Sequence, residues 1–361
     1  MSMAVCEFAP LSVVGPKSQE NPKAGAEFSG ASETLTELMM GGLASQALYV
    51  AAKLGVADQL KDGPKPVETI ARQVEADVNS LYRVLRALAS FGVFEEEDNR
   101  VFKLNQLAAP LCSDAQGSLR DNAIFMGEDW HWQVWGKTLY SVRTGKPAWG
   151  QVHGQEVFPY LASNQKAARI FDDAMSSFST IAAAAVLEAY DFSPIETLVD
   201  VAGGHGRLLS EILKVNPSMR GVLFDQPHVL AGANDSLEKY GVAARCDLVS
   251  GDFFESVPAN ADGYILKHII HDWDDERATR ILRNIRSVMR NDARVLLVES
   301  VIAEGGKRDF SKLLDIEMLV SPGGQERTAV EYGQLFAAAG LRLTRIISTK
   351  SPYSVIEAVA P

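Results

Sequence analysis

The sequence is poor in cysteine and has no long apolar run. Its three cysteines, Cys6, Cys112 and Cys246, lie far apart without CxxC or Cys/His spacing, which argues against a disulfide framework and a zinc site. No stretch approaches the roughly 18 consecutive apolar residues of a membrane span, and residues 1–10 lack the basic start of a signal peptide. We therefore expect a cytoplasmic protein with no membrane partner.

Positive charge is also scarce. The chain has 35 Lys and Arg residues against 46 Asp and Glu residues, which gives a formal net charge of −11 and opposes non-specific binding to nucleic acids. The rest is ordinary globular composition, 47% hydrophobic and 22% charged, in a chain of 361 residues that is long for one domain. We expect two domains and no nucleic-acid partner.

The N-terminal part predicts a small helical domain. Residues 1–28, rich in Pro, Gly, Lys and Glu, are predicted to be a flexible tail. Residues 29–115 show helical spacing over 31–60, then two short helices and a hairpin around Asp98–Asn99. This order is typical of a winged helix, and we interpret it as a dimerisation domain because the long helix has a wider apolar face than a small domain can bury.

A winged helix also predicts DNA binding, so a transcriptional regulator is the alternative from another class. The predicted wing carries four acids, Glu95–Asp98, and Arg83 and Arg86 on the second helix do not offset them. Acids at this position would face the phosphates of DNA, so the wing argues against this alternative.

Residues 116–190 are predicted to be a mostly helical connector that is dense in aromatic side chains. These side chains either pack between the domains or form the wall of a pocket for a flat aromatic substrate, and both can hold together. The candidate substrate-binding residues are Met126, Trp130, Phe171 and Met175.

Residues 191–361 alternate strand-like and helical segments, which predicts an α/β sheet. The last two strands are joined by a few residues and must therefore pair antiparallel. Strands are expected at 197–201, 220–225, 245–250, 262–267, 293–301, 341–347 and 353–359.

The loop after the first of these strands is built for a ligand. Gly203, Gly204 and Gly206 permit positive φ and a close approach of the backbone to a ligand. Their spacing differs from G-x-G-x-x-G, which disfavours a pyrophosphate cofactor. Asp200 precedes the loop and Asp225 ends the next strand, where it can hold a ribose diol. A ribose without a pyrophosphate suggests S-adenosylmethionine.

Five motifs then carry a resemblance that covers residues 31–361. The sequence resembles the S-adenosylmethionine-dependent small-molecule O-methyltransferases, a family that includes plant caffeic-acid-type and bacterial natural-product enzymes. The motifs are LVDVAGGHG at 198–206, FDQP at 224–227, GDFF at 251–254, LKHIIHDWDDE at 266–276 and GGQERT at 323–328. The resemblance implies a class I methyltransferase fold, a Rossmann-like sheet of seven strands with an N-terminal winged-helix dimerisation domain. It also implies a homodimer, no metal, and methyl transfer to a hydroxyl of an aromatic or polyketide-like molecule.

The same resemblance implies a set of cofactor-binding residues. Asp252 and Phe253 would bracket the adenine of S-adenosylmethionine. With Asp200, inside the strand before the loop, and Gly251, after the third strand, the full set of candidates is Ser179, Asp200, Gly203, Gly204, Asp225, Gly251, Asp252, Phe253 and Lys267. Ala202 stands where the family usually has glycine, so the resemblance predicts an ordinary φ there.

His271 is expected to be the general base. It falls between a strand and the next helix, where its side chain can face the crevice, although His268 has an equal claim on composition. Glu299 and Glu326 occupy the positions where the family places two acids beside its catalytic histidine. A neutral imidazole with a pKa near 6.5 can take the proton of a phenol as the oxygen attacks the methyl group.

Two alternatives concern this site. Asp272, Asp274 and Asp275 can be imagined as magnesium ligands, but Asp274 is better placed to cap the following helix, and we expect no metal. A hydroxylase or decarboxylase of the same fold, with S-adenosylmethionine as a bystander, is the enzyme alternative.

Overall fold

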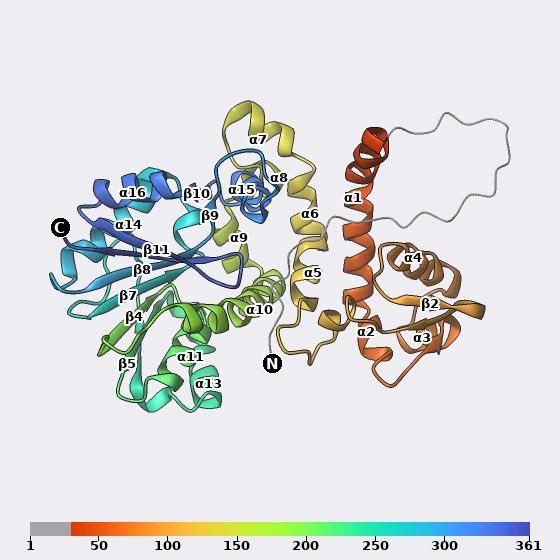
Figure 1. Ribbon diagram of the computed structural model, residues 1–361, viewed down its shortest axis with the longest axis horizontal. Helices are drawn as coiled ribbons and strands as arrows, with labels where there is room; N and C mark the ends of the chain where they lie inside the picture. Colours follow the sequence, from red (N-terminus) through yellow and green to blue (C-terminus); the bar gives the residue numbers. More distant parts are fainter. Residues whose placement is uncertain (1–29) are drawn as a thin grey trace.

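The computed structural model describes residues 30–361 as a helical lobe and a sheet lobe joined by further helices (Figure 1). In Figure 1 the N-terminal helices lie at the right and the sheet at the left, with α5, α6 and α10 between them. The tail predicted for residues 1–28, which includes Cys6, lies outside the described residues.

The N-terminal lobe has the predicted order of helices and hairpin. α4 begins at an N-cap, Asp77, whose side chain accepts the Ser80 N–H at 2.9 Å, and it buries Leu81, Leu85 and Leu88 on one face. β3 lies between β1 and β2 and pairs antiparallel with both. The elements are α1 (Gly30–Lys53), α2 (Val56–Gln59), β1 (Lys65–Pro66), α3 (Val67–Gln73), α4 (Val78–Ser90), β2 (Glu95–Glu97), η1 (Asp98–Arg100), β3 (Val101–Lys103) and η2 (Ala109–Leu111).

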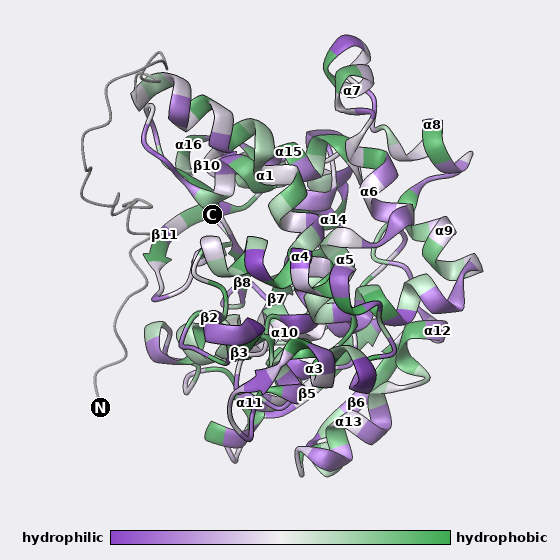
Figure 2. Cartoon of the chain, turned by 90° about the vertical axis from the view of Figure 1, so that its right-hand side faces the viewer, coloured by the Kyte–Doolittle hydropathy of each residue, from purple (hydrophilic) through white to green (hydrophobic). Residues whose placement is uncertain are grey.

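The first half of α1 exposes apolar side chains. Figure 2 turns this side of the molecule to the viewer and shows green, apolar segments along α1. Exposed fractions there run from 49% for Met40 to 72% for Leu38, with Leu35, Met39 and Leu43 between them. Such a face is more typical of an interface than of a free surface.

The connector is helical, as predicted. α10 is long and apolar enough to cross a membrane by length and composition, but it packs on α5 and α11 and buries Ala182, Ala183 and Val186 in a core that it shares with the sheet. The helices are α5 (Arg120–Gly127), α6 (Asp129–Trp135), α7 (Thr138–Thr144), α8 (Trp149–His153), α9 (Val157–Ser163) and α10 (Gln165–Ala189).

The sheet of the C-terminal lobe has seven strands in the order β11-β12-β8-β7-β4-β5-β6. Pairing is parallel from β6 to β8, whereas β12 runs antiparallel to β8 and to β11, so the final hairpin is confirmed. The strands are β4 (Thr197–Val201), β5 (Arg220–Asp225), β6 (Cys246–Ser250), β7 (Gly263–Lys267), β8 (Arg294–Glu299), β11 (Arg342–Ser348) and β12 (Ser354–Val359), with a parallel pair, β9 (Val301–Ile302) and β10 (Arg327–Thr328), beside them.

The central strands of the sheet are buried on both faces. Along β8, Leu296 and Val298 point into one core, and Val295 and Leu297 into the other, which is the period of two expected of a strand. The covering helices and turns are α11 (Arg207–Val215), α12 (Pro227–Leu230), α13 (Ala233–Lys239), η3 (Ala243–Arg245), η4 (Ile270–Asp272), α14 (Asp275–Val288), α15 (Phe310–Val320) and α16 (Ala329–Ala338). Asp274 caps α14 as predicted, because its side chain accepts the Arg277 N–H at 2.8 Å.

The prediction for Ala202 is wrong. Its φ is +56°, in the left-handed region that disfavours a residue with a Cβ. The Ala202 N–H donates to the Phe224 carbonyl oxygen at 2.7 Å, which continues the β4–β5 pairing into the loop and holds the residue in that conformation.

Candidate active site

Four acidic or basic side chains meet at the carboxyl edge of the parallel strands. Asp225, Lys267 and Glu299 are the last residues of β5, β7 and β8, and Asp200 lies in β4 between β5 and β7. Parallel strands end at the same edge, which is where open α/β sheets bind their ligands.

The glycine loop fits tightly against the sheet on one side and is open on the other. A Cβ on Gly203 would lie 2.5 Å from Asp200 Cγ and from a methyl of Leu223, so only glycine fits there. Gly204, with φ of +59°, would place a Cβ more than 4 Å from every described atom outside its two chain neighbours. Its N–H donates to Asp225 Oδ2 at 2.8 Å, which brings the loop and the strand-end carboxylate together.

Asp200 is buried without a full set of partners. Asp200 is only 2% exposed, and its Oδ2 has no hydrogen-bond partner within residues 30–361. Burial raises the pKa of Asp200 to about 7, although the charge of Lys267 opposes this. Burial lowers the pKa of Lys267 in turn. A buried acceptor in this state is suited to a polar ligand group.

The other candidate cofactor residues differ in their exposure and in their hydrogen-bond partners. Gly251 contacts the ring of Phe224, and Asp252 is exposed at the rim, where Oδ1 accepts the Phe254 N–H at 2.8 Å. Phe253 and Phe254 pack edge to face with centroids 4.8 Å apart. The Ser179 hydroxyl donates within α10, to the Met175 carbonyl oxygen at 2.7 Å, so its contact with a cofactor stays a prediction.

His271 lies in η4, shortly after β7, and its Nδ1 faces two buried carboxylates. Its Nδ1 is 2.7 Å from Glu326 Oε1 and 3.4 Å from Glu299 Oε2. Its Nε2 is 3.6 Å from Asp272 Oδ1, beyond hydrogen-bonding distance. Glu299 and Glu326 are 0% and 3% exposed, and Oε2 of each has no hydrogen-bond partner in the described part of the chain. The structure therefore brings together the three residues singled out from the sequence.

The expected imidazole pKa near 6.5 is wrong for this environment. Burial lowers the pKa of His271, but the negative charges of Glu299 and Glu326 outweigh burial and raise it to about 10. Burial raises the pKa of Glu299 to about 7 and that of Asp272 to about 6. The sequence could not show this shift because it depends on carboxylates that converge from separate elements.

His268 is a weaker candidate base. Its pKa lies well below the ordinary value because of burial and the nearby charges of Lys267 and His271. Its Nδ1 faces Lys267 Nζ at 3.4 Å, and its ring packs on Tyr353 at 4.2 Å. It thus lacks the carboxylate contact that His271 has.

The aromatic group of the connector is a packed cluster. Trp130 and Phe171 each lie 5.7 Å from Phe125, centroid to centroid, so two of the four substrate candidates are brought together. Met126 is next to Phe125 in α5, and Met175 follows Phe171 by about one turn in α10. Phe125 is 8% exposed, so the packing interpretation holds for at least part of the group.

Sequence reasoning missed a second buried histidine pair and an arginine. His131 in α6 meets Glu317 in α15 through Nε2 and Oε1 at 2.8 Å, and Trp135 Nε1 donates to Glu317 Oε2 at 2.6 Å. Arg327 belongs to the GGQERT motif but had no predicted role, and it is wholly buried. No local spacing pairs residues so far apart in the chain.

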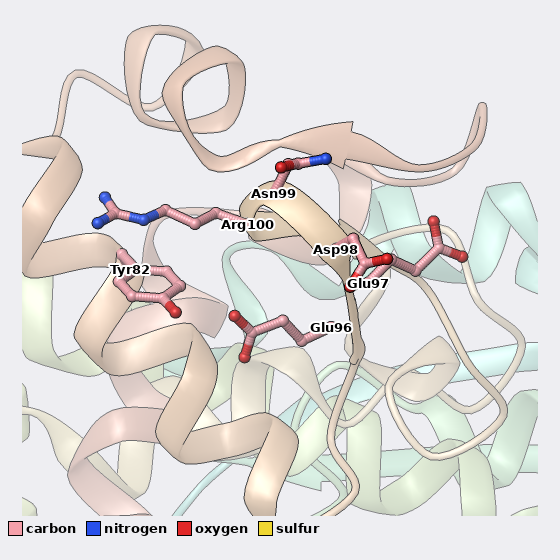
Figure 3. Close-up of a pocket in the computed structure, with 6 residues that line it drawn as sticks. All are labelled: Tyr82, Glu96, Glu97, Asp98, Asn99 and Arg100. Atoms are coloured by element: carbon pink, nitrogen blue, oxygen red, sulfur yellow. The ribbon is translucent and has the colours of Figure 1, made fainter.

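The wing has a separate shallow hollow, lined by Tyr82 and by residues 96–100 (Figure 3). In Figure 3 the Arg100 side chain extends over the Tyr82 ring, with Cζ 4.5 Å from its centroid. Lys103 Nζ bridges Glu95 at 2.8 Å and Glu97 at 3.3 Å. Two acids of the wing are thus paired with Lys103 within the hairpin, and the wing does not form a basic surface.

The histidine cluster has the geometry of a possible metal site. Ligand atoms of His271, Glu299 and Glu326 lie within 4.8 Å of one another, a spacing that one cation can bridge. However, Nδ1 and Oε1 already contact each other directly. The absence of a metal from the reaction stays a prediction.

The sheet order, the glycine loop and the strand-end carboxylates define a class I S-adenosylmethionine-dependent methyltransferase. Family models match an O-methyltransferase domain over residues 135–342 and an O-methyltransferase dimerisation domain over residues 36–114. The chain belongs to this O-methyltransferase family.

Individual relatives agree over nearly the whole chain. The chain is 45% identical to a phenazine O-methyltransferase of Lysobacter antibioticus, over 94% of this chain and 98% of that protein. A methyltransferase of calicheamicin biosynthesis, solved with S-adenosylhomocysteine, has a TM-score of 0.82 at 35% identity and covers 92% of this chain and 98% of its own. An O-methyltransferase of neocarzinostatin biosynthesis, solved with S-adenosylmethionine and 2-hydroxy-5-methyl naphthoic acid, has a TM-score of 0.76 at 29% identity and covers 94% and 100%. The chain is thus an S-adenosylmethionine-dependent O-methyltransferase.

Proposed function

We propose that this enzyme methylates a hydroxyl of an aromatic or polyketide-like small molecule, with His271 as the general base. The observation that carries the proposal is an imidazole whose Nδ1 faces two buried carboxylates at the carboxyl edge of the sheet, with Nε2 left for the acceptor. The relatives named for phenazine and solved with a naphthoic acid support a flat aromatic acceptor. A bystander role for S-adenosylmethionine would need no such base, which disfavours the hydroxylase or decarboxylase alternative.

The cofactor fits the residues of the crevice. Asp225 would hold the ribose diol. The space beside Gly204 lets a ligand approach the backbone, and Oδ2 of Asp200 can accept a hydrogen bond from a ligand. When bound, S-adenosylmethionine supplies a methyl group on a positively charged sulfur. The remaining residues proposed for this site are Ser179, Gly203, Gly251, Asp252, Phe253 and Lys267.

His271 acts by taking the acceptor proton at Nε2 as the oxygen attacks. Glu326 accepts the Nδ1 hydrogen, fixes the tautomer and, with Glu299, stabilises the imidazolium that forms. The neighbouring carboxylates raise the pKa of His271 to about 10, close to that of a phenol. The neutral imidazole, whose fraction grows with pH, is therefore the form that accepts the proton. Met126, Trp130, Phe171 and Met175 would hold the acceptor ring, and such positioning supplies further acceleration.

A homodimer completes the proposal. The dimerisation domain matches residues 36–114, and the apolar half of α1 in this domain is exposed in the single chain. A second copy of α1 would cover it. The proposal includes a cytoplasmic enzyme with no nucleic-acid or membrane partner, and light scattering at micromolar concentration tests its oligomeric state.

The function is tested by incubating the purified protein with methyl-labelled S-adenosylmethionine and a panel of phenols, hydroxyphenazines and hydroxynaphthoates. Mass spectrometry should find one labelled methyl on an oxygen of at least one acceptor, and His271→Ala is the matched control. Label on nitrogen alone, or equal turnover by the control, would contradict the proposal.

A further inference from the structure

Arg327 is a charged side chain with no exposure, and each of its three guanidinium nitrogens donates a hydrogen bond. It follows Glu326 directly and begins β10, where it pairs with Val301 of β9. Its Nε and Nη2 donate to Asp275 Oδ1 at 3.0 and 2.8 Å. Burying a guanidinium costs free energy unless its N–H groups have hydrogen-bond acceptors, so the partners of Arg327 are needed to keep it buried.

The guanidinium of Arg327 also donates hydrogen bonds to the turn that carries His271. Nη1 donates to the Ile270 carbonyl oxygen at 3.1 Å, and Nη2 donates to the Trp273 carbonyl oxygen at 2.9 Å. These carbonyls lie just before and two residues after His271. One planar group therefore spans the turn from both sides.

The residues before Arg327 hold the same turn. The Gln325 N–H donates to the His271 carbonyl oxygen at 2.9 Å. A Cβ on Gly324 would lie 2.0 Å from that oxygen, so only glycine permits this approach. Glu326, between Gln325 and Arg327, places Oε1 at 2.7 Å from His271 Nδ1. The segment that supplies the carboxylate also fixes the backbone of its partner.

We propose that Arg327 is a positioning residue that sets the distance between the Glu326 carboxylate and the His271 imidazole. The inference rests on the proposed function, in which that pair is the base. Arginine is required because its planar fork reaches two carbonyls and a carboxylate at once, whereas a lysine ammonium has a single centre.

The test compares Arg327→Lys with the native enzyme. Histidine labelled with ¹³C reports the imidazole pKa directly, and His271→Ala assigns the signal among the six histidines. We expect the pKa of His271 to fall by about one unit, because a looser Glu326 contact weakens the charge interaction. We expect kcat to fall by about tenfold to a hundredfold through misplacement of the base, with little change in the Kd of S-adenosylmethionine.

Two further variants keep the test decisive. Arg290→Lys changes an exposed arginine that pairs with Asp262 at 2.8 Å, at the opposite end of β7, and should move neither quantity. Asp275→Asn, at a side chain that is 71% exposed, should shift the His271 pKa in the same direction by less, and it replaces Arg327→Lys if that variant does not fold. An unshifted His271 pKa in a folded variant overturns the inference. Full activity of His271→Ala would instead overturn the proposed function and leave the pKa comparison in force.

Discussion

The molecule contains two buried histidine–glutamate pairs that look alike at first. In the connector, His131 meets Glu317 at 2.8 Å, and at the sheet edge His271 meets Glu326 at 2.7 Å. All four residues are at most 8% exposed. Distance and burial therefore do not separate the two pairs.

The two histidine–glutamate pairs differ in how many of their hydrogen-bonding atoms have partners. The second oxygen of Glu317 accepts the Trp135 N–H, and His131 Nδ1 faces the Met126 carbonyl oxygen at 3.4 Å, so each group of this pair has a partner. At the sheet edge, Oε2 of Glu326 has no partner within residues 30–361, and His271 Nε2 has no group within hydrogen-bonding distance. A filled pair stabilises a fold, whereas capacity left open in a buried site is available to a reacting group.

The largest expected effect follows from removing His271. His271→Ala should lower kcat by about 10²-fold to 10⁴-fold, because the phenol loses its proton acceptor, and leave the Kd of S-adenosylmethionine nearly unchanged. Steady-state rates and calorimetry measure the two quantities. Comparable turnover at a pH where the acceptor is protonated would transfer the role to His268 or remove general-base catalysis.

His131→Leu should act on stability instead. Leaving Glu317 buried without its partner costs about 3 to 5 kcal/mol of unfolding free energy. Glu317 raises the pKa of His131 despite burial, so the stabilisation is fully present below pH 6.5 and is lost as pH rises through the folded-state pKa. Thermal unfolding across this pH range should show the gap from the native Tm narrowing as pH rises. A loss of kcat as large as that of His271→Ala would erase the distinction between the pairs.

Glu326→Gln sharpens the comparison through pH. In the native enzyme kcat/KM should rise with pH above 7, because the pKa of His271 is about 10 and its base form grows as the proton leaves. Removing one adjacent negative charge should lower that pKa by about one to three units and move the rising limb to lower pH, with a lower plateau from a weaker base. A limb that stays in place would show that Glu326 does not set the pKa of His271.

Asp225→Ala tests the cofactor side of the crevice. Loss of a charge-assisted hydrogen bond to the ribose should cost about 1.5 to 3 kcal/mol, or about tenfold to a hundredfold in the Kd of S-adenosylmethionine. Calorimetry measures it, with Asp247→Ala, an exposed acid on β6, as the control that should not change. Unchanged affinity in Asp225→Ala would mean that the strand-end acid does not contact the cofactor.

The contrast between the pairs also marks what the sequence can reveal. The bounds of β4 and β5 match the prediction because a short apolar run and the turn that bounds it are local signals. His271 and Glu326 were found because they stand in motifs, and Glu299 because it lies late in a predicted strand, where the family places an acid. The His131–Glu317 pair has no such signal, since its members are 186 positions apart. The same limit explains the errors at Ala202, whose φ depends on a hydrogen bond to β5, and at His271, whose pKa depends on three separate elements.

The smallest expected effect concerns Ala202. Here the cofactor site differs from the rest of the fold in backbone strain, as it does in its unpaired hydrogen-bonding atoms. With φ at +56°, its Cβ costs about 1 to 2 kcal/mol, and glycine would relieve this at a cost of about 0.5 to 1 kcal/mol in unfolded-state entropy. Ala202→Gly should therefore stabilise the protein by about 1 kcal/mol or less, which thermal unfolding detects as a rise in Tm of about 2 to 4 °C at most. Ala337→Gly, at an exposed position in α16, is the matched control and should destabilise by about 1 kcal/mol. Equal losses of stability in both variants would mean that the cofactor loop stores no strain at Ala202.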